Sequence, residues 1–181
     1  MNSCERMTFK VSILLLALVI GFAGTTTMAQ HDDNKGTEFV MVFLQNFTGG
    51  ANVELHLTSD QPIDVMVEWP MGAPTFFDTV AVAPGSITIV VVPSAAAQGW
   101  TNGIVQSNAV RAFSDSEFVC YMINRQGFTS DAALGLPVDV MNTEYIVINN
   151  TGTTIGSWDG GEFGVVAPFD NTTVTITPTK D

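Results

Sequence analysis

The sequence predicts an all-β domain of antiparallel strands packed as a sandwich, and two observations carry this prediction. From Gly36 onward, the apolar residues fall in short runs rich in Val, Ile, Thr and Phe, separated by Gly, Pro, Asn, Asp and Ser. Such runs are typical of strands joined by turns. No window sustains the apolar stripe of a helix, and the best helical candidate, 94–98, is one turn bounded by Pro93 and Gly99. A propeller of radial blades is the alternative all-β architecture.

Residues 1–29 have the pattern of a cleavable signal peptide. Two basic residues precede an apolar run, 11–24, and a small and polar stretch follows that suits cleavage after Ala29. The apolar run is shorter than the about 20 residues that a membrane-spanning helix needs, so we expect no integral membrane span after signal cleavage. Residues 30–35 are polar and are expected to form a flexible lead-in to a single domain at 36–181.

The chain is strongly acidic, with 18 Asp and Glu, 6 Lys and Arg, and a formal net charge of -12. Nucleic acid and anionic membranes are bound through basic surfaces, so neither is expected as a partner. In so acidic a chain, we expect Arg111 and Arg125 to pair with carboxylates that have a structural role.

Cysteine usage excludes a disulfide within the domain. Cys4 lies in the signal segment, which leaves Cys120 alone in the apolar run 117–123. A cysteine in such a run usually behaves as a small buried hydrophobe, and an intermolecular disulfide is the alternative.

The strands can be placed one by one along the chain. We expect them at 38–45, 52–58, 63–69, 77–82, 86–92, 108–113, 117–123, 143–149, 162–167 and 172–177. Strand 52–58 alternates apolar and polar residues, so one face should meet the core and the other water. The runs 39–44 and 87–92 are apolar on both faces and are expected to lie centrally. Residues 83–86, Ala-Pro-Gly-Ser, should join two strands as a tight turn.

The strand pattern also repeats. Residues 36–42, GTEFVMV, recur as NTEYIVI at 142–148, which indicates sub-repeats at 36–141 and 142–181, the second truncated. The alternative is that any two antiparallel strand pairs have a similar residue pattern without being true repeats.

A series of short segments resembles a known family. The segments are GTEF at 36–39, AVRAFSDS at 109–116, SDAALGLPV at 130–138, NTEY at 142–145, FGVVA at 163–167 and DNTTVTI at 170–176. In this order they resemble the N-terminal domain of IgGFc-binding proteins over 36–178. This chain departs from the family where it has Met141-Asn142 in place of the usual Leu-Gly, and family domains are generally longer.

The resemblance implies a secreted extracellular module for recognition or adhesion, with a protein or glycoprotein partner. It does not imply that this chain binds IgG. The alternative function is structural, a self-associating matrix or surface-layer subunit whose exposed edge strands pair with copies of itself.

Chemistry for catalysis is missing from the sequence. His31 lies in the polar lead-in, and His56 stands alone on the polar side of an alternating strand. The motifs of phosphate loops, nucleophile elbows, zinc helices and calcium loops are absent. We therefore expect no enzyme activity, no metal and no cofactor.

Aromatic loops are the candidate binding residues. Exposed aromatic side chains on stiff loops are typical anchors for a partner, and these loops carry acidic residues but no Lys or Arg, so a neutral or basic partner is expected. The alternative is that the rings fold back and cap the sandwich core. The candidates are Trp69, Phe76, Phe77, Trp100 and Trp158.

Three sequons supply candidate N-glycosylation sites at Asn46, Asn149 and Asn171. All lie at the ends of expected strands, where a glycan would point to water.

Overall fold

The computed structural model describes residues 33–46, 52–98, 101, 103–127, 129–148 and 162–178, all within the unit His31–Asp181. This part of the chain is all-β, as the sequence predicts. The strands are β1 (Gly36–Met41), β2 (Asn52–Thr58), β3 (Ile63–Trp69), β4 (Phe76–Val82), β5 (Thr88–Val92), β6 (Val110–Arg125) and β7 (Ser130–Leu134). Two short helical elements accompany them, α2 (Ala95–Gln98) and the 3-10 turn η1 (Val138–Val140). α2 lies within 94–98, the best helical candidate of the sequence.

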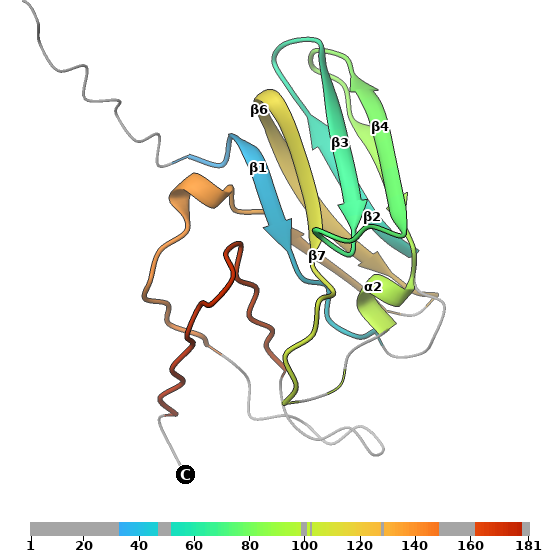
Figure 1. Ribbon diagram of the computed structural model, residues 1–181. Helices are drawn as coiled ribbons and strands as arrows, with labels where there is room; N and C mark the ends of the chain where they lie inside the picture. Colours follow the sequence, from blue (N-terminus) through green and yellow to red (C-terminus); the bar gives the residue numbers. More distant parts are fainter. Residues whose placement is uncertain are drawn as a thin grey trace, which may run out of the picture. The chain divides into compact units, whose positions relative to one another are not determined.

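The strands form one antiparallel sheet that folds over into two layers (Figure 1). The front layer has the order β4-β3-β6-β1 and the back layer β5-β2-β6-β7, so β6 belongs to both. The β4–β5 turn joins the layers on one side, and a bridge between Phe39 and Pro137 joins β1 to the segment after β7 on the other. The sheet is therefore nearly closed, and the described strands form no radial blades.

A bend lets β6 serve both layers. Its first part, 110–113, pairs with β1 and β3, and its second part, 119–125, pairs with β2. The register with β1 shifts between the two parts, as expected where a bulge turns a strand from one layer into another. The Ser114 hydroxyl donates to the Asp64 carbonyl at 2.8 Å beside the bend. The sequence predicted two separate strands here, at 108–113 and 117–123, but the structure has one continuous strand. The polar residues between the two predicted strands mark a bend in β6 and not the end of a strand.

The core lies between the layers and follows the period-two pattern of the strands. Phe39 and Phe118 are both fully buried, and their rings pack with centroids 4.7 Å apart. Around this pair lie the inward side chains of every strand from β1 to β6. These include Met41, Val53, Leu55, Leu57, Val65, Val67, Val82, Val90, Val92, Val110 and Ala112.

Cys120 belongs to this core, which confirms the prediction of a small buried hydrophobe. Its side chain is fully buried and lies 3.5 Å from the Met41 sulfur. Burial raises the pKa of the Cys120 thiol to about 12, because the thiolate would be desolvated. The thiol is therefore unreactive while the domain stays folded.

The two runs that are apolar on both faces do not lie centrally, and this prediction was wrong. β5 ends the strand order of the back layer, with Ile89 52% and Val91 59% exposed. β1 pairs only with β6 among the described strands, although Val40 and Met41 are both buried. Both strands are apolar on their two faces, but with different outcomes. The apolar residues of β1 are buried on both faces, whereas the outer face of β5 is an exposed apolar surface.

The C-terminal runs 143–148, 162–167 and 172–177 are not strands, so three predicted strands were wrong; residue 149 lies outside the described residues. A strand needs a neighbour to satisfy its backbone N–H and C=O groups, and no described strand pairs with these runs. Gly164 does approach Leu44, where an added Cβ would meet Leu44 Cδ2 at 2.8 Å. The sub-repeats remain a prediction.

The turn at 83–86 and strand β7 show where local chemistry places an element and where it does not. The tight turn predicted at 83–86 is confirmed, with the Ser86 N–H donating to the Ala83 carbonyl at 3.2 Å. Gly85 has φ 66°, a backbone conformation that favours glycine. By contrast, β7 was not predicted, because Ser-Asp-Ala-Ala-Leu carries no β-branched or aromatic residue. Pairing with β6 makes it a strand.

Candidate functional site

The predicted aromatic residues do not gather into one exposed site within the described part of the chain. Trp69 and Phe76 are directly opposite each other on β3 and β4 and pack against the core. Phe77 faces outward and is 56% exposed. Trp100 and Trp158 lie outside the described residues.

Trp69 is also held by a hydrogen bond. Its indole N–H donates to Asn108 Oδ1 at 2.8 Å, and Asn108 Nδ2 donates to the Ala96 carbonyl at 3.1 Å. Asn108 thus ties the tryptophan to α2. This placement favours the alternative that Trp69 caps the core. Phe77 is then the exposed aromatic residue of β3 and β4.

The sequons differ in accessibility. The Asn46 side chain is 4% exposed and donates through Nδ2 to the Asn124 side chain at 3.2 Å, so the folded domain does not present this nitrogen to solvent. Asn171 is exposed, with φ 61°, in a C-terminal turn. Asn149 lies outside the described residues.

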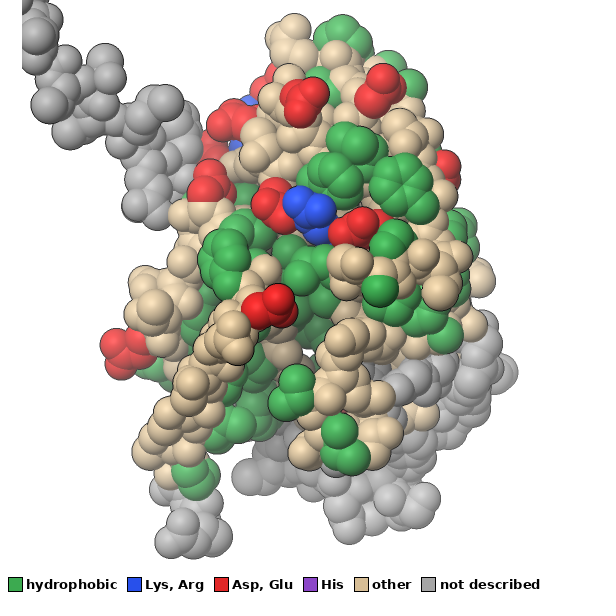
Figure 2. Space-filling model, viewed as in Figure 1, with side chains coloured by type: hydrophobic (Ala, Val, Ile, Leu, Met, Phe, Trp, Pro, Cys, Tyr) green, Lys and Arg blue, Asp and Glu red, His purple; other side chains and the backbone are tan. Residues whose placement is uncertain are grey.

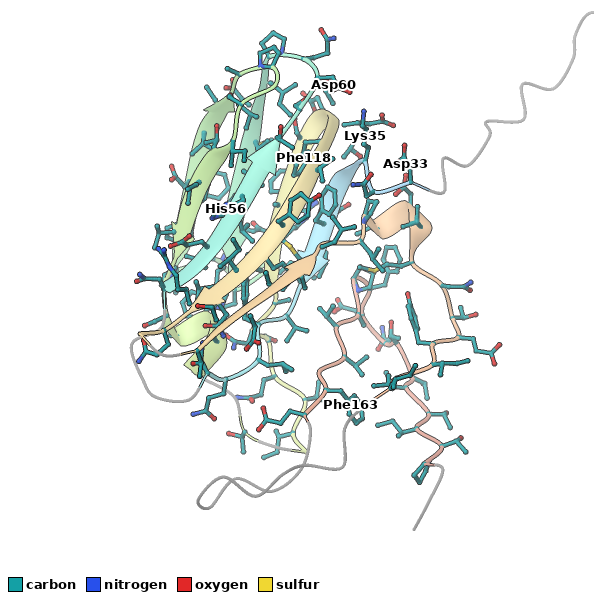
Figure 3. All side chains as sticks on the ribbon, turned by 180° about the vertical axis from the view of Figure 1, so that it is seen from behind. Asp33, Lys35, His56, Asp60, Phe118 and Phe163 are labelled. Atoms are coloured by element: carbon teal, nitrogen blue, oxygen red, sulfur yellow. The ribbon has the colours of Figure 1, made fainter. Side chains whose placement is uncertain are left out.

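The outer side of the back layer, here called the back face, carries a group of exposed apolar side chains. Figure 3 views the domain from this side, with His56 labelled on β2. Ile89 lies opposite His56, His56 opposite Tyr121, and Tyr121 opposite Leu134, so one row crosses all four strands. The exposed apolar members of the back face are Ile87 at 67%, Ile89 at 52%, Val91 at 59%, Tyr121 at 44% and Leu134 at 41%.

An ion-pair network lies within the back face. Arg125 Nη2 donates to Glu54 Oε1 at 2.8 Å, and His56 Nε2 lies 2.9 Å from Glu54 Oε2. Both carboxylate oxygens of Glu54 are therefore occupied, which allows this side chain to be only 7% exposed on an outer face. The expected carboxylate partner of Arg125 is confirmed.

The hydrogen bond from His56 and the charge of Arg125 lower the pKa of Glu54 against the opposing effect of burial. Because its pKa is lowered in the folded protein, the Glu54 carboxylate stabilises the fold at pH values above its ordinary pKa of 4.5. This contribution is lost as the pH falls through the lowered pKa. We therefore expect Glu54→Gln to cost stability at neutral pH and progressively less in acid. Denaturant titrations across this range test it, and a difference from the parent that does not change with pH would contradict it.

The outer side of the front layer is organised around Arg111. Its Nε donates to Glu38 Oε1 at 2.6 Å and its Nη1 to Glu68 Oε1 at 3.4 Å, while the guanidinium carbon lies 4.1 Å from the centre of the Phe113 ring. Figure 2 shows a basic group between acidic ones on this face. The expected pairing of Arg111 is confirmed, and its guanidinium is already satisfied by two carboxylates and a ring.

The two faces therefore differ in what they offer a partner. On the front layer Arg111 is already paired with two carboxylates, and Phe77 is the large exposed apolar side chain of β3 and β4. The back face combines a preformed ion-pair network with a broad apolar surface. Large exposed apolar patches mark interaction sites, so the back face is the candidate binding surface.

Sequence reasoning missed the back face. The signal was present in Ile87, Ile89 and Val91, whose spacing puts them on one side of a strand. The apolar pattern predicted this strand at the centre of the sheet and so did not predict that these side chains are exposed. The position of β5 at the end of the strand order depends on pairings between segments far apart in the sequence.

In the described ranges, His, Cys, Asp and Glu residues form no group of three or more that could hold a metal ion. No helix in those ranges is long and apolar enough to cross a bilayer.

Residues 131–181 match the model of the IgGFc binding protein family. The resemblance stated from the sequence is therefore confirmed for the C-terminal part of the chain, from β7 onward. A solved structure, described as Crystal Structure of Thermotoga maritima 1070, is similar with a TM-score of 0.39 and 12% sequence identity, covering 59% of this chain and 98% of that chain. No curated protein matches the chain.

Proposed function

We propose that this protein is a secreted, non-catalytic binding module that recognises an extracellular protein or glycoprotein through the back face. The observation that carries the proposal is the row of Ile89, His56, Tyr121 and Leu134 across four strands. The family match over 131–181 supports a binding role, and the signal pattern of residues 1–29 supports export.

The back face has the physical features of a protein-binding surface. Its side chains stand on strands, so little conformational freedom is lost when a partner docks. Tyr121 offers an apolar ring and a hydroxyl at the centre of the row, and tyrosine is enriched among residues that dominate binding energy. Glu54 and Arg125 already satisfy each other, so docking a partner over them would not leave an unpaired charge.

Charge narrows the class of partner. The chain has a formal net charge of -12. An acidic partner would be repelled on approach, whereas a basic rim would accelerate association. We therefore infer a partner with an apolar centre and a neutral or basic rim.

A matched pair of substitutions tests the proposal. Purified domain is applied to an array of extracellular glycoproteins that includes the Fc fragment of IgG, and the affinity of each bound member is measured by interferometry. We expect Tyr121→Ala to weaken binding by about 30-fold, since a central aromatic anchor contributes about 2 kcal/mol. Phe77→Ala removes a somewhat more exposed aromatic side chain from the front layer and should change affinity less than about threefold.

The result can contradict the proposal in two ways. If Phe77→Ala weakens binding and Tyr121→Ala does not, the aromatic loops predicted from sequence are the site. If no array member binds the parent, the binding role itself loses its support. Ile89→Lys provides a second back-face variant and should weaken binding alongside Tyr121→Ala.

A further inference from the structure

β7 presents an open edge in the described part of the chain. It pairs with β6 on one side, and no described strand pairs with its other side (Figure 3). All of its residues are exposed, so no described segment covers this edge. An open edge offers a row of backbone donors and acceptors to an incoming strand.

The register identifies which backbone groups face the open edge. The Gly135 N–H donates to the Cys120 carbonyl at 2.8 Å, and residues that bond to the neighbouring strand alternate along an antiparallel pair. Ala133 and Asp131 therefore bond to β6, whereas Leu134 and Ala132 direct their N–H and C=O groups outward.

The same chain carries a strand-like run without a partner strand. Residues 143–148, TEYIVI, have the composition of a strand, yet they pair with no described strand. Tyr145 is 59% exposed, Ile146 90%, Val147 57% and Ile148 93%, so both faces of the run are exposed. The other C-terminal runs are weaker donors, because Gly164 interrupts one, and the other alternates threonine with apolar residues and so offers only one apolar face.

The run does not pair with the β7 edge of its own domain. The segment that connects them is fixed to β1, where Pro137 bridges to Phe39. An added Cβ on Gly36 would meet the Pro137 Cβ at 2.3 Å, which shows how closely the connection lies on β1. The chain therefore leaves β7 toward β1 and not back along the open edge.

We propose that residues 143–148 of one molecule add as a strand to the β7 edge of a second copy of this protein. The edge and the donated strand are different surfaces, so the contact is head-to-tail and each molecule can bind two others. Repeating this contact gives an open-ended assembly, or a closed ring where the rotation between copies closes. Because the chain is acidic, association should strengthen as salt screens the repulsion between copies.

Two substitutions separate the acceptor edge from the donor run. Ala132→Pro removes an outward N–H without removing a bond to β6, which is where an edge strand tolerates proline. Ala132→Val keeps the N–H and is its control. Ile146→Lys places a charge in the exposed run, and Ile176→Lys, at a residue 63% exposed elsewhere in the C-terminal segments, is its control.

Sedimentation velocity over a wide range of concentration is the test, with circular dichroism to verify folding. We expect the parent and both controls to grow in size with concentration, and Ala132→Pro and Ile146→Lys each to weaken association by about tenfold or more. An equimolar mixture of these two variants retains one intact edge and one intact donor, so it should form dimers and nothing larger.

Three outcomes would overturn the proposal. One is a parent that stays monomeric throughout the range. Another is unchanged assembly in both variants, and the third is a mixture that assembles no better than either variant alone. If Ala132→Pro fails to fold, Ile146→Lys still decides the matter, because its side chain lies outside the core. Binding of a heterologous partner through Tyr121 is a separate measurement and does not depend on this outcome.

Discussion

Phe118→Ala should lower the free energy of unfolding by about 3–5 kcal/mol, the largest single effect that we expect. The side chain is fully buried, and its ring packs on Phe39 between the two layers. It also stands where β6 leaves its bend, opposite Gly36 of β1. Removing the ring would therefore open a cavity where the layers share a strand.

Chemical denaturation of the variant measures this loss directly. Phe118→Leu is the matched control, because it keeps most of the apolar volume and should cost about 1 kcal/mol or somewhat more. A loss below about 1 kcal/mol for Phe118→Ala would mean that this ring does not join the layers as described.

Trp69→Ala should cost about 3 kcal/mol, near the lower end of the range for removing a buried aromatic side chain, since Trp69 is partly exposed. The expected loss has two sources, the packing of the ring against the core and the hydrogen bond from its indole N–H to Asn108. Trp69→Phe keeps most of the packing and removes the hydrogen bond, so it should fall between the parent and the alanine variant.

Thermal melts of the two variants, together with a binding assay, distinguish a core residue from a binding residue. A Trp69→Ala variant that melts with the parent but loses its partner would restore the binding role predicted from sequence. An early melt with intact affinity at low temperature would confirm that Trp69 caps the core.

Much of the fold could be predicted from local pattern. The alternation of Val53, Leu55 and Leu57 placed β2 with its inward face, and the turn at 83–86 followed from its residue types. These features depend on near neighbours in sequence, which is why they were predictable. Pairing was less accessible, because the same residues can form a strand or a coil according to what lies beside them.

The C-terminal runs and the back face show this limit in opposite ways. Residues 143–148 have strand composition and no partner strand among the described residues, whereas β7 has a poor strand composition and is held by β6. The exposure of Ile89 likewise follows from β5 ending the strand order, and a single sequence does not encode strand order locally. Strand pairing also decides which predicted aromatic residues are exposed. The adjacent residues Phe76 and Phe77 have similar side chains, yet Phe76 faces the core and Phe77 faces solvent.

Hydroxyl-radical footprinting of the complex tests most directly whether a partner binds over the back face. The partner is the array member with the highest affinity, and oxidation of individual side chains is compared between the free and bound domain by mass spectrometry. We expect Tyr121, Leu134 and Ile89 to be protected in the complex while Phe77 is oxidised at its free rate. Protection of Phe77 with no change at Tyr121 would contradict the account.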